Sequence, residues 1–152
     1  MIIQTYEESK KEEIKELVLG VLLEHGFEYD RLKDADLKDI NGYYFAKGGI
    51  FFMGLEDGKV IGTSGVRKLK DGRGEIRRIY LKKEFRNKGY GKRLFLAALA
   101  FAEKNCSCAV LKTDATLKKA IDMYLKNGFI LSQDNQMSKN TKFDYIYFEK
   151  QF

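Results

Sequence analysis

The spacing of apolar residues near the start of the chain predicts a strand followed by a helix. The apolar start, Ile2–Tyr6, predicts a short strand. Ser9 and Glu12 have the spacing of a capping box, and a helical repeat follows them as far as Gly26. The apolar positions of this repeat are Ile14, Leu17, Val18, Val21 and Leu22.

The middle of the chain has the period of strands. The runs IFFMGLE and KVIGTSGVRKL are joined by Asp-Gly at 57–58, which is a strong hairpin signal. A second Asp-Gly, at 71–72, leads into a predicted strand over Glu75–Leu81. The segment before these strands, 27–48, has no clear period, and we expect a short helix around Asp36–Tyr43.

Helices and strands alternate in the last third of the chain. Gly89–Lys104 predicts a helix whose middle is apolar on all sides, so neighbours should cover it. A strand is expected at Ala109–Thr113, and closing strands at Phe129–Ser132 and Phe143–Phe148. Between them a helical stripe ends at Asn-Gly, 127–128; its members are Leu117, Ala120, Ile121, Tyr124 and Leu125.

This order of elements predicts an α/β fold (an α+β mixed sheet) in a single domain over 1–152. The chain is 44% hydrophobic and 13% aromatic, which is enough to fill a core. The start, MIIQTYEESKKEE, has no signal-peptide apolar stretch. The longest apolar run, Leu94 to Ala102, is far shorter than the ~20 residues that span a bilayer. We therefore expect a cytoplasmic protein without a membrane partner.

The positive charge is concentrated in one segment. Residues 73–93 hold nine basic and two acidic residues, a net charge of +7, which is more than the +6 of the whole chain. A generally basic protein would suggest non-specific binding of polyanions, whereas one basic segment suggests a local anion site.

Within that segment, RNKGYG lies between a predicted strand and a predicted helix. Its two glycines permit positive φ, so that successive amides can point at one anion, and the helix N-terminus adds partial positive charge. Four cations crowd this helix start, where they are unfavourable without a ligand: Arg86, Lys88, Lys92 and Arg93. We infer a polyphosphate-type ligand. The alternative is a glycine-rich turn with a solvated basic rim.

Four features in order resemble the GNAT superfamily of acyl-CoA N-acyltransferases. They are EIRRIYL, the loop RNKGYG opening a helix, AVLKT, and AIDMYLKNGF, which together cover about residues 74–130. Lys83 stands where many members have Pro, and Asn87 where Gly is common. Asn tolerates left-handed geometry well, so the loop keeps its character.

The resemblance implies a central mixed sheet of about six to seven strands with about four helices, and acetyl-CoA as co-substrate without a metal. Backbone groups of Ile79, Tyr80 and Leu81 would bind the pantetheine. The diphosphate would lie on the loop residues Arg86, Asn87, Lys88, Gly89, Tyr90, Gly91 and Lys92. An amine would then attack the thioester directly, through an oxyanion stabilised by a backbone N–H.

Two residues are candidate catalytic groups by the same resemblance. Tyr124 matches the family tyrosine that protonates the departing thiolate; the alternative is a core residue on the apolar stripe. Glu75 opens the central strand, where some members carry a general base that removes a proton from the amine, which is mostly protonated at neutral pH. The alternative is a surface carboxylate that pairs with Arg73 or Arg77.

The acceptor is expected to be a primary amine of a small molecule or a protein. Residues 24–39 carry a net charge of −3 and border the acceptor cleft in the family, which slightly favours a cationic amine; a solvated acidic helix face explains the charge as well. A homodimer is possible. The lone His25, and Cys106 and Cys108 at non-motif spacing, indicate no metal site.

The sequence leaves two alternative functions. KGYG followed by Phe95 resembles an RNA-recognition signature, but a helix there would bury Phe95 instead of displaying it, so nucleic acid is not expected. A non-catalytic acyl-CoA-binding sensor would share the fold, although the presence of Tyr124 argues against it.

Overall fold

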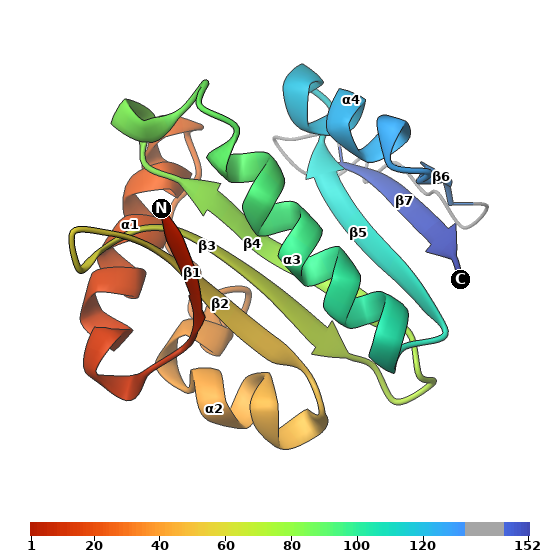
Figure 1. Cartoon of the computed structure of the whole chain (residues 1–152), viewed down its shortest axis with the longest axis horizontal. Coiled ribbons are helices and arrows are strands. Elements are labelled where there is room, and N and C mark those ends of the chain that lie inside the picture. The colour runs from red at the N-terminus through yellow and green to blue at the C-terminus, as the bar shows by residue number, and fades with distance from the viewer. Residues whose placement is uncertain (133–144) are drawn as a thin grey trace.

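The computed structural model describes residues 1–132 and 145–152, which form one seven-stranded sheet in the order β1-β2-β3-β4-β5-β7-β6 (Figure 1). The strands are β1 Ile2–Thr5, β2 Ile50–Glu56, β3 Lys59–Lys68, β4 Gly74–Leu81, β5 Cys108–Asp114, β6 Ile130–Leu131 and β7 Tyr145–Gln151. The helices are α1 Lys11–Glu24, α2 Ile40–Tyr43, α3 Tyr90–Asn105 and α4 Lys118–Lys126. Short 3-10 turns lie at Glu8–Lys10, Ala35–Lys38, Phe45–Lys47 and Lys83–Phe85.

The predicted mixed sheet with about four helices is confirmed. The short helix expected near Asp36–Tyr43 is split into a 3-10 turn and α2. The last strand begins at Tyr145 among the described residues, and the expected start at Phe143 lies outside them. No helix in the described ranges is both long and apolar enough to cross a membrane.

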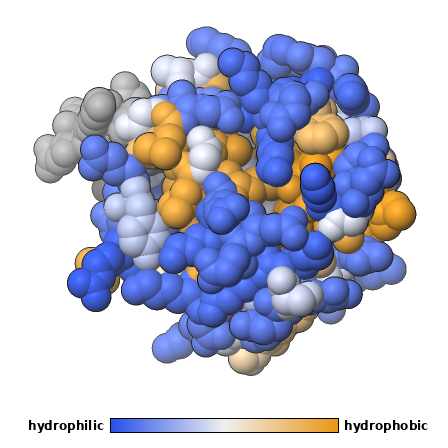
Figure 2. All heavy atoms as spheres, turned by 90° about the vertical axis from the view of Figure 1, so that its left-hand side faces the viewer, coloured by the Kyte–Doolittle hydropathy of each residue, from blue (hydrophilic) through white to orange (hydrophobic). Residues whose placement is uncertain are grey.

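Helices cover both faces of the sheet. On one face, α3 and α4 bury a cluster with β4, β5 and β7 that includes Phe95, Leu111 and Phe148 (Figure 1). On the other face, α1 and α2 bury a second cluster around Tyr44 and Phe51. The side of the molecule on which α1 lies is mainly hydrophilic, with apolar side chains showing between polar ones (Figure 2).

The start of α1 differs from the expected capping box. Ser9 lies inside the 3-10 turn that precedes the helix, so Lys10 takes the N-cap position and no side chain caps the helix there. Glu13 instead accepts a hydrogen bond from the Val60 amide at 2.9 Å, which ties α1 to β3. The helix therefore begins one residue later than the capping-box spacing suggests.

The pair β4–β5 is the parallel one in the sheet, and its ladder is short. Only Gly74 with Ala109 and Glu75 with Val110 are paired, whereas β5 pairs with β7 along seven residues. Beyond Glu75, β4 stays bonded to β3 but separates from β5. The two strands therefore enclose a wedge, with its closed end at Glu75 and Val110.

A β-bulge lies on β4 next to this wedge. Arg77 faces Gly65 and Tyr80 faces Thr63, so two residues of β4, 78 and 79, stand opposite one residue of β3. Arg78 takes a φ of 57°, which is uncommon for a residue other than glycine. The Thr63 hydroxyl donates to the Arg78 carbonyl at 2.6 Å and holds the bulge in place.

The side chain of Arg78 is buried in an ion cluster that connects β4 to the segment before α2. Its guanidinium bonds Asp36 at 2.6 Å and Asp34 at 2.8 Å, and the Tyr44 hydroxyl donates to Asp36 at 2.5 Å. Burial opposes ionisation of Asp36, but Arg78 outweighs it and holds the pKa of that carboxyl below its usual value of 3.8. The cluster fixes the bulge and the 3-10 turn Ala35–Lys38 in one arrangement.

We expect Arg78→Met to lower the free energy of unfolding by about 3–5 kcal/mol at pH 7, because it leaves two carboxylates buried without their partner. Arg73→Met is the matched control: it removes an exposed pair with Asp71 and should cost less than about 1 kcal/mol. Urea unfolding measures both.

The pH dependence of this loss has a definite sign. The stability contributed by Asp36 is complete above its unfolded pKa near 3.8 and is lost as pH falls through the lower folded value. The difference between wild type and Arg78→Met should therefore shrink when the measurement is repeated at pH 3. Equal losses for the Arg78 and Arg73 variants at pH 7 would contradict this account.

Candidate active site

The loop between β4 and α3 presents free amides. Asn87 and Gly89 have φ values of 66° and 81°, and Gly89 is the N-cap of α3 without any side-chain cap. Among the described residues, the amides from 87 to 92 have no hydrogen-bond acceptor, and Arg93 donates the first helical bond, to Gly89. The first turn of α3 contains no acidic residue. This is the backbone arrangement that binds phosphate groups at helix N-termini.

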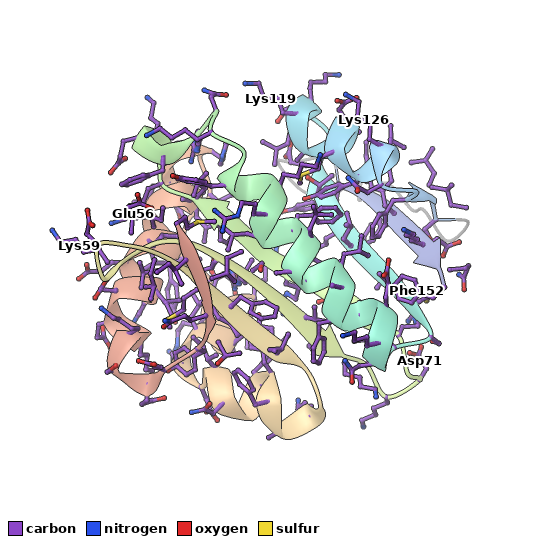
Figure 3. The ribbon with its side chains drawn as sticks, viewed as in Figure 1. Glu56, Lys59, Asp71, Lys119, Lys126 and Phe152 are labelled. Carbon is purple, nitrogen blue, oxygen red and sulfur yellow. The ribbon has the colours of Figure 1, made fainter. Side chains whose placement is uncertain are left out.

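Open space lies next to these amides. A Cβ built on Gly89 or Gly91 would meet no atom within 4 Å. The Asn87 side chain is held by Lys119 of α4, whose ammonium lies 3.1 Å from it, and Figure 3 labels Lys119 at the start of α4. The loop residues expected to bind a polyphosphate therefore have the space, the free donors and the positive charge that such a ligand needs.

The side chain of Arg86 is bound to the protein itself. Its guanidinium donates twice to the Leu81 carbonyl, at 2.8 and 3.0 Å, and pairs with Glu24 of α1 at 2.8 Å. The arginine therefore joins the end of β4 to α1 and to the loop. The Leu81 carbonyl, one of the backbone groups expected to bind the pantetheine, therefore already accepts two hydrogen bonds within the protein.

Tyr124 lies in an aromatic cluster under α4. Its ring centre is 5.3 Å from that of Phe95 and 6.2 Å from those of Phe129 and Phe148. The residue is 7% exposed, and burial, followed by the nearby Tyr80, raises the pKa of Tyr124 to about 12. Its hydroxyl has no hydrogen-bond partner within the described ranges. The residue is thus both part of the core and a free, protonated donor near β4.

Glu75 lies at the closed end of the wedge and is paired with arginines. Its carboxylate is 3.2 Å from the guanidinium of Arg77 and 3.8 Å from that of Arg67. Arg73 pairs with Asp71 instead. The alternative of a carboxylate paired with Arg77 is therefore present in the structure, at the position where a base is also expected.

Three residues near Glu75 were not predicted from the sequence: Tyr43, Arg67 and Lys112. Tyr43 accepts hydrogen bonds from both Arg67 and Arg77, and Lys112 lies 5.0 Å from the ring centre of Tyr145. These residues come from α2, β3 and β5, and no local motif marks them. Their grouping follows from the pairing of the strands and, for Tyr43, from the place of α2 beside them.

The acidic segment 24–39 is not a solvated helix face. Asp34 and Asp36 are buried against Arg78, and Glu24 pairs with Arg86. Asp30 accepts hydrogen bonds from two backbone amides of its own turn. The expectation of a cationic acceptor rested on this segment, and most of its charge is used within the protein.

The RNA-recognition alternative needs an aromatic side chain on display at position 95, and the structure does not provide one. Phe95 is 0% exposed within α3. In the described part of the chain, no group of three or more His, Cys, Asp or Glu side chains could hold a metal ion.

Comparison with known families identifies the class of protein. The model of the acetyltransferase (GNAT) family matches residues 12–129 of the 152-residue chain. The chain therefore belongs to the acetyltransferase (GNAT) family, and the resemblance seen in the sequence is confirmed. No curated protein sequence matches significantly.

Solved structures show the same fold over almost the whole chain. A GNAT-family acetyltransferase from Staphylococcus aureus Mu50 is 26% identical, with a TM-score of 0.85, over 99% of this chain and 98% of that one. An acetyltransferase from Streptococcus agalactiae is 21% identical, with a TM-score of 0.86 and the same coverages. A protein from Salmonella typhimurium, described as an acetyltransferase and solved with its cofactor acetyl-CoA, is 16% identical, with a TM-score of 0.81, over 99% of this chain and 93% of its own.

We expect Arg86→Gln to lower the free energy of unfolding by about 1–2 kcal/mol, because it removes a half-exposed ion pair and two bonds to a backbone carbonyl. Lys88→Gln, two residues on in the same loop, should stay within about 0.5 kcal/mol of wild type. Chemical denaturation without ligand provides the comparison. If both variants matched wild type, the guanidinium would not be the structural link described above.

Proposed function

We propose that this chain is an acetyl-CoA-dependent N-acetyltransferase, which transfers the acetyl group to a primary amine of a small molecule or a protein. The observation that carries the proposal is the combination of an uncapped amide loop at 87–92 with a wedge between β4 and β5. The loop suits a diphosphate, and the wedge suits an extended chain that bonds to β4. Coenzyme A joins these two chemical parts in one molecule.

Acetyl-CoA supplies an activated thioester, and the protein holds it where an amine can reach its carbonyl carbon. Backbone groups of Ile79 and Tyr80 would hold the pantetheine, and an N–H of β4 near the bulge would stabilise the oxyanion. A C–N bond forms, the C–S bond breaks, and the thiolate leaves with a proton. With the thioester held in this way, the reaction would take place at the closed end of the wedge.

Tyr124 is the proposed donor of the proton to the thiolate. Its pKa of about 12 keeps the hydroxyl protonated at any working pH, so it is always available to donate. Complete proton transfer to the thiolate, whose conjugate thiol has a pKa of ~8.5, is uphill, but a hydrogen bond to the developing negative charge lowers the barrier.

Glu75 is the proposed general base, acting through a water molecule. It is the last paired residue before β4 separates from β5, so its carboxylate lies where the amine would approach. Arg67 and Arg77 hold this carboxylate in place.

We expect Gly89→Val to weaken acetyl-CoA binding at least about tenfold, because a β-branched residue disfavours a φ of 81° and would displace the loop amides. Gly58→Val is the matched control: Gly58 has a φ of 76°, also has no atom within 4 Å of a built Cβ, and lies in the β2–β3 turn. Both variants should lose about 1–2 kcal/mol of stability. Calorimetric titration with acetyl-CoA separates them.

Wild-type protein that failed to bind acetyl-CoA would overturn the proposed function. Equal affinity in the Gly89 and Gly58 variants would instead show that the diphosphate does not lie on this loop.

We expect Tyr124→Phe to lower kcat about tenfold or more while leaving acetyl-CoA affinity nearly unchanged, because only the proton donor is removed. Tyr29→Phe, a change at a residue that is 38% exposed, should leave kcat as in wild type. Release of free thiol during turnover is the readout. An unchanged kcat would mean that Tyr124 serves only the core, and acetyl-CoA binding without turnover of any amine would favour the sensor.

A further inference from the structure

Three cations surround the closed end of the wedge, and we call them the basic cluster: Arg67 of β3, Arg77 of β4 and Lys112 of β5. Glu75 pairs with Val110 across the parallel ladder, and with Arg67 across the antiparallel one. Paired residues share a face of a sheet, and residues two apart on a strand do so as well. All three cations therefore project on the same face as Glu75.

This face is opposite the one covered by α3 and α4. Ile76 and Leu111, which alternate with these residues along β4 and β5, pack against Phe95 and Ala98 of α3. Arg77 and Lys112 each lie two residues beyond the last paired position, on opposite sides of the wedge. A molecule that approaches the closed end of the wedge from this face therefore meets the basic cluster first.

The basic cluster has more positive charge than it has partners. Arg67 and Arg77 share one carboxylate, Glu75, and one phenol oxygen, that of Tyr43. The Nε of Arg67 is buried and has no hydrogen-bond acceptor, since Glu75 is 3.8 Å away. Lys112 forms no ion pair within the described ranges.

Three carboxylates near the basic cluster are engaged elsewhere. A fourth, Glu149 of β7, pairs with Val110 on the same face and forms no ion pair with Lys112 among the described residues. Asp34 and Asp36 neutralise the buried Arg78. Asp114, the next residue on this face of β5, accepts hydrogen bonds from the amide and the hydroxyl of Thr116. Desolvation, and then the charge of Arg77, lower the pKa of Lys112, which is the direction expected for a cation that lacks an anion.

We propose that the acceptor carries an anionic oxyacid group, a carboxylate or a phosphate, besides its amine, and that Arg67, Arg77 and Lys112 bind this group. The proposal rests on the acetyltransferase function proposed above and names the substrate class of that site. A planar guanidinium can donate two parallel hydrogen bonds to a pair of oxygens on either anion, and an ammonium adds a point charge. A carboxylate at Glu75 beside them suits the amine end of the same molecule.

The test compares acceptors that differ only in the anionic group. One panel contains L-amino acids and their C-terminal amides; a second contains O-phosphoethanolamine and ethanolamine. The kcat/KM of thiol release is measured with saturating acetyl-CoA, and acetyl-CoA affinity is measured separately by calorimetry. We expect the anionic member of at least one pair to exceed its neutral counterpart about tenfold or more, and the two panels show whether carboxylate or phosphate is preferred.

Lys112→Gln and Arg77→Gln should each reduce this preference about tenfold, with acetyl-CoA affinity unchanged. For Lys112→Gln the loss should fall mainly on KM, whereas Arg77→Gln also removes a partner of Glu75 and should lower kcat for both members of a pair. Arg73→Gln and Lys104→Gln are the matched controls: both residues lie outside the basic cluster, and neither change should alter the preference. Because Arg77 contacts Glu75 and Tyr43, its variant is also checked by thermal unfolding. Lys112 forms no ion pair among the described residues, so its variant provides the test that depends least on stability.

The outcomes distinguish this proposal from the one on which it rests. Failure to bind acetyl-CoA would overturn the proposed function. The anionic acceptor alone would be overturned if acetyl-CoA binds normally but neutral or cationic amines are turned over as well as or better than the acids. These amines are the amides, ethanolamine and a polyamine such as spermidine. An anionic preference that survives in Lys112→Gln and Arg77→Gln, or the absence of turnover with every anionic acceptor, would overturn it as well.

Discussion

The ladder between β4 and β5 stops after two residue pairs, and the rest of the site depends on this break. A strand inside a sheet must satisfy its polar backbone groups on both sides, so an interior strand with one free side is open to an extended ligand. β5 keeps its full ladder with β7, and β4 keeps its ladder with β3. The break is therefore supported from both sides and does not weaken the sheet as a whole.

Charge is arranged around the break in two different ways. At the bulge, Arg78 is neutralised by two buried carboxylates, and this cluster holds the backbone shape. One residue earlier, Arg77 is only partly neutralised and lies on the open face. Because of the bulge, the consecutive residues Arg77 and Arg78 project on the same face of the sheet. Arg78 is a structural ion, and Arg77 keeps charge that can bind another group.

The order of the elements and the glycine-containing loop between β4 and α3 could be predicted from the sequence because both depend on local patterns. Glycine spacing, helix periodicity and the Asp-Gly turn act within a few residues. The wedge, the bulge and the basic cluster could not be predicted in this way. Burial of Asp34 and Asp36 within the acidic segment 24–39 could not be predicted either, because the arginine that binds them lies 44 and 42 residues away. The positive φ of Arg78 could not be predicted, because no glycine or asparagine lies next to it in the sequence.

Helix α4 contributes to the site at two levels. Near its start, Lys119 holds the Asn87 side chain of the loop, and in its second half Tyr124 is locked among three phenylalanine rings. The helix has only nine residues, so these two contacts belong to one rigid piece. Anything that orders the loop also restrains the helix. Under the proposed function, occupancy of the loop by acetyl-CoA and placement of the Tyr124 phenol are therefore thermodynamically linked, and any effect of one on the other is returned with the same coupling free energy.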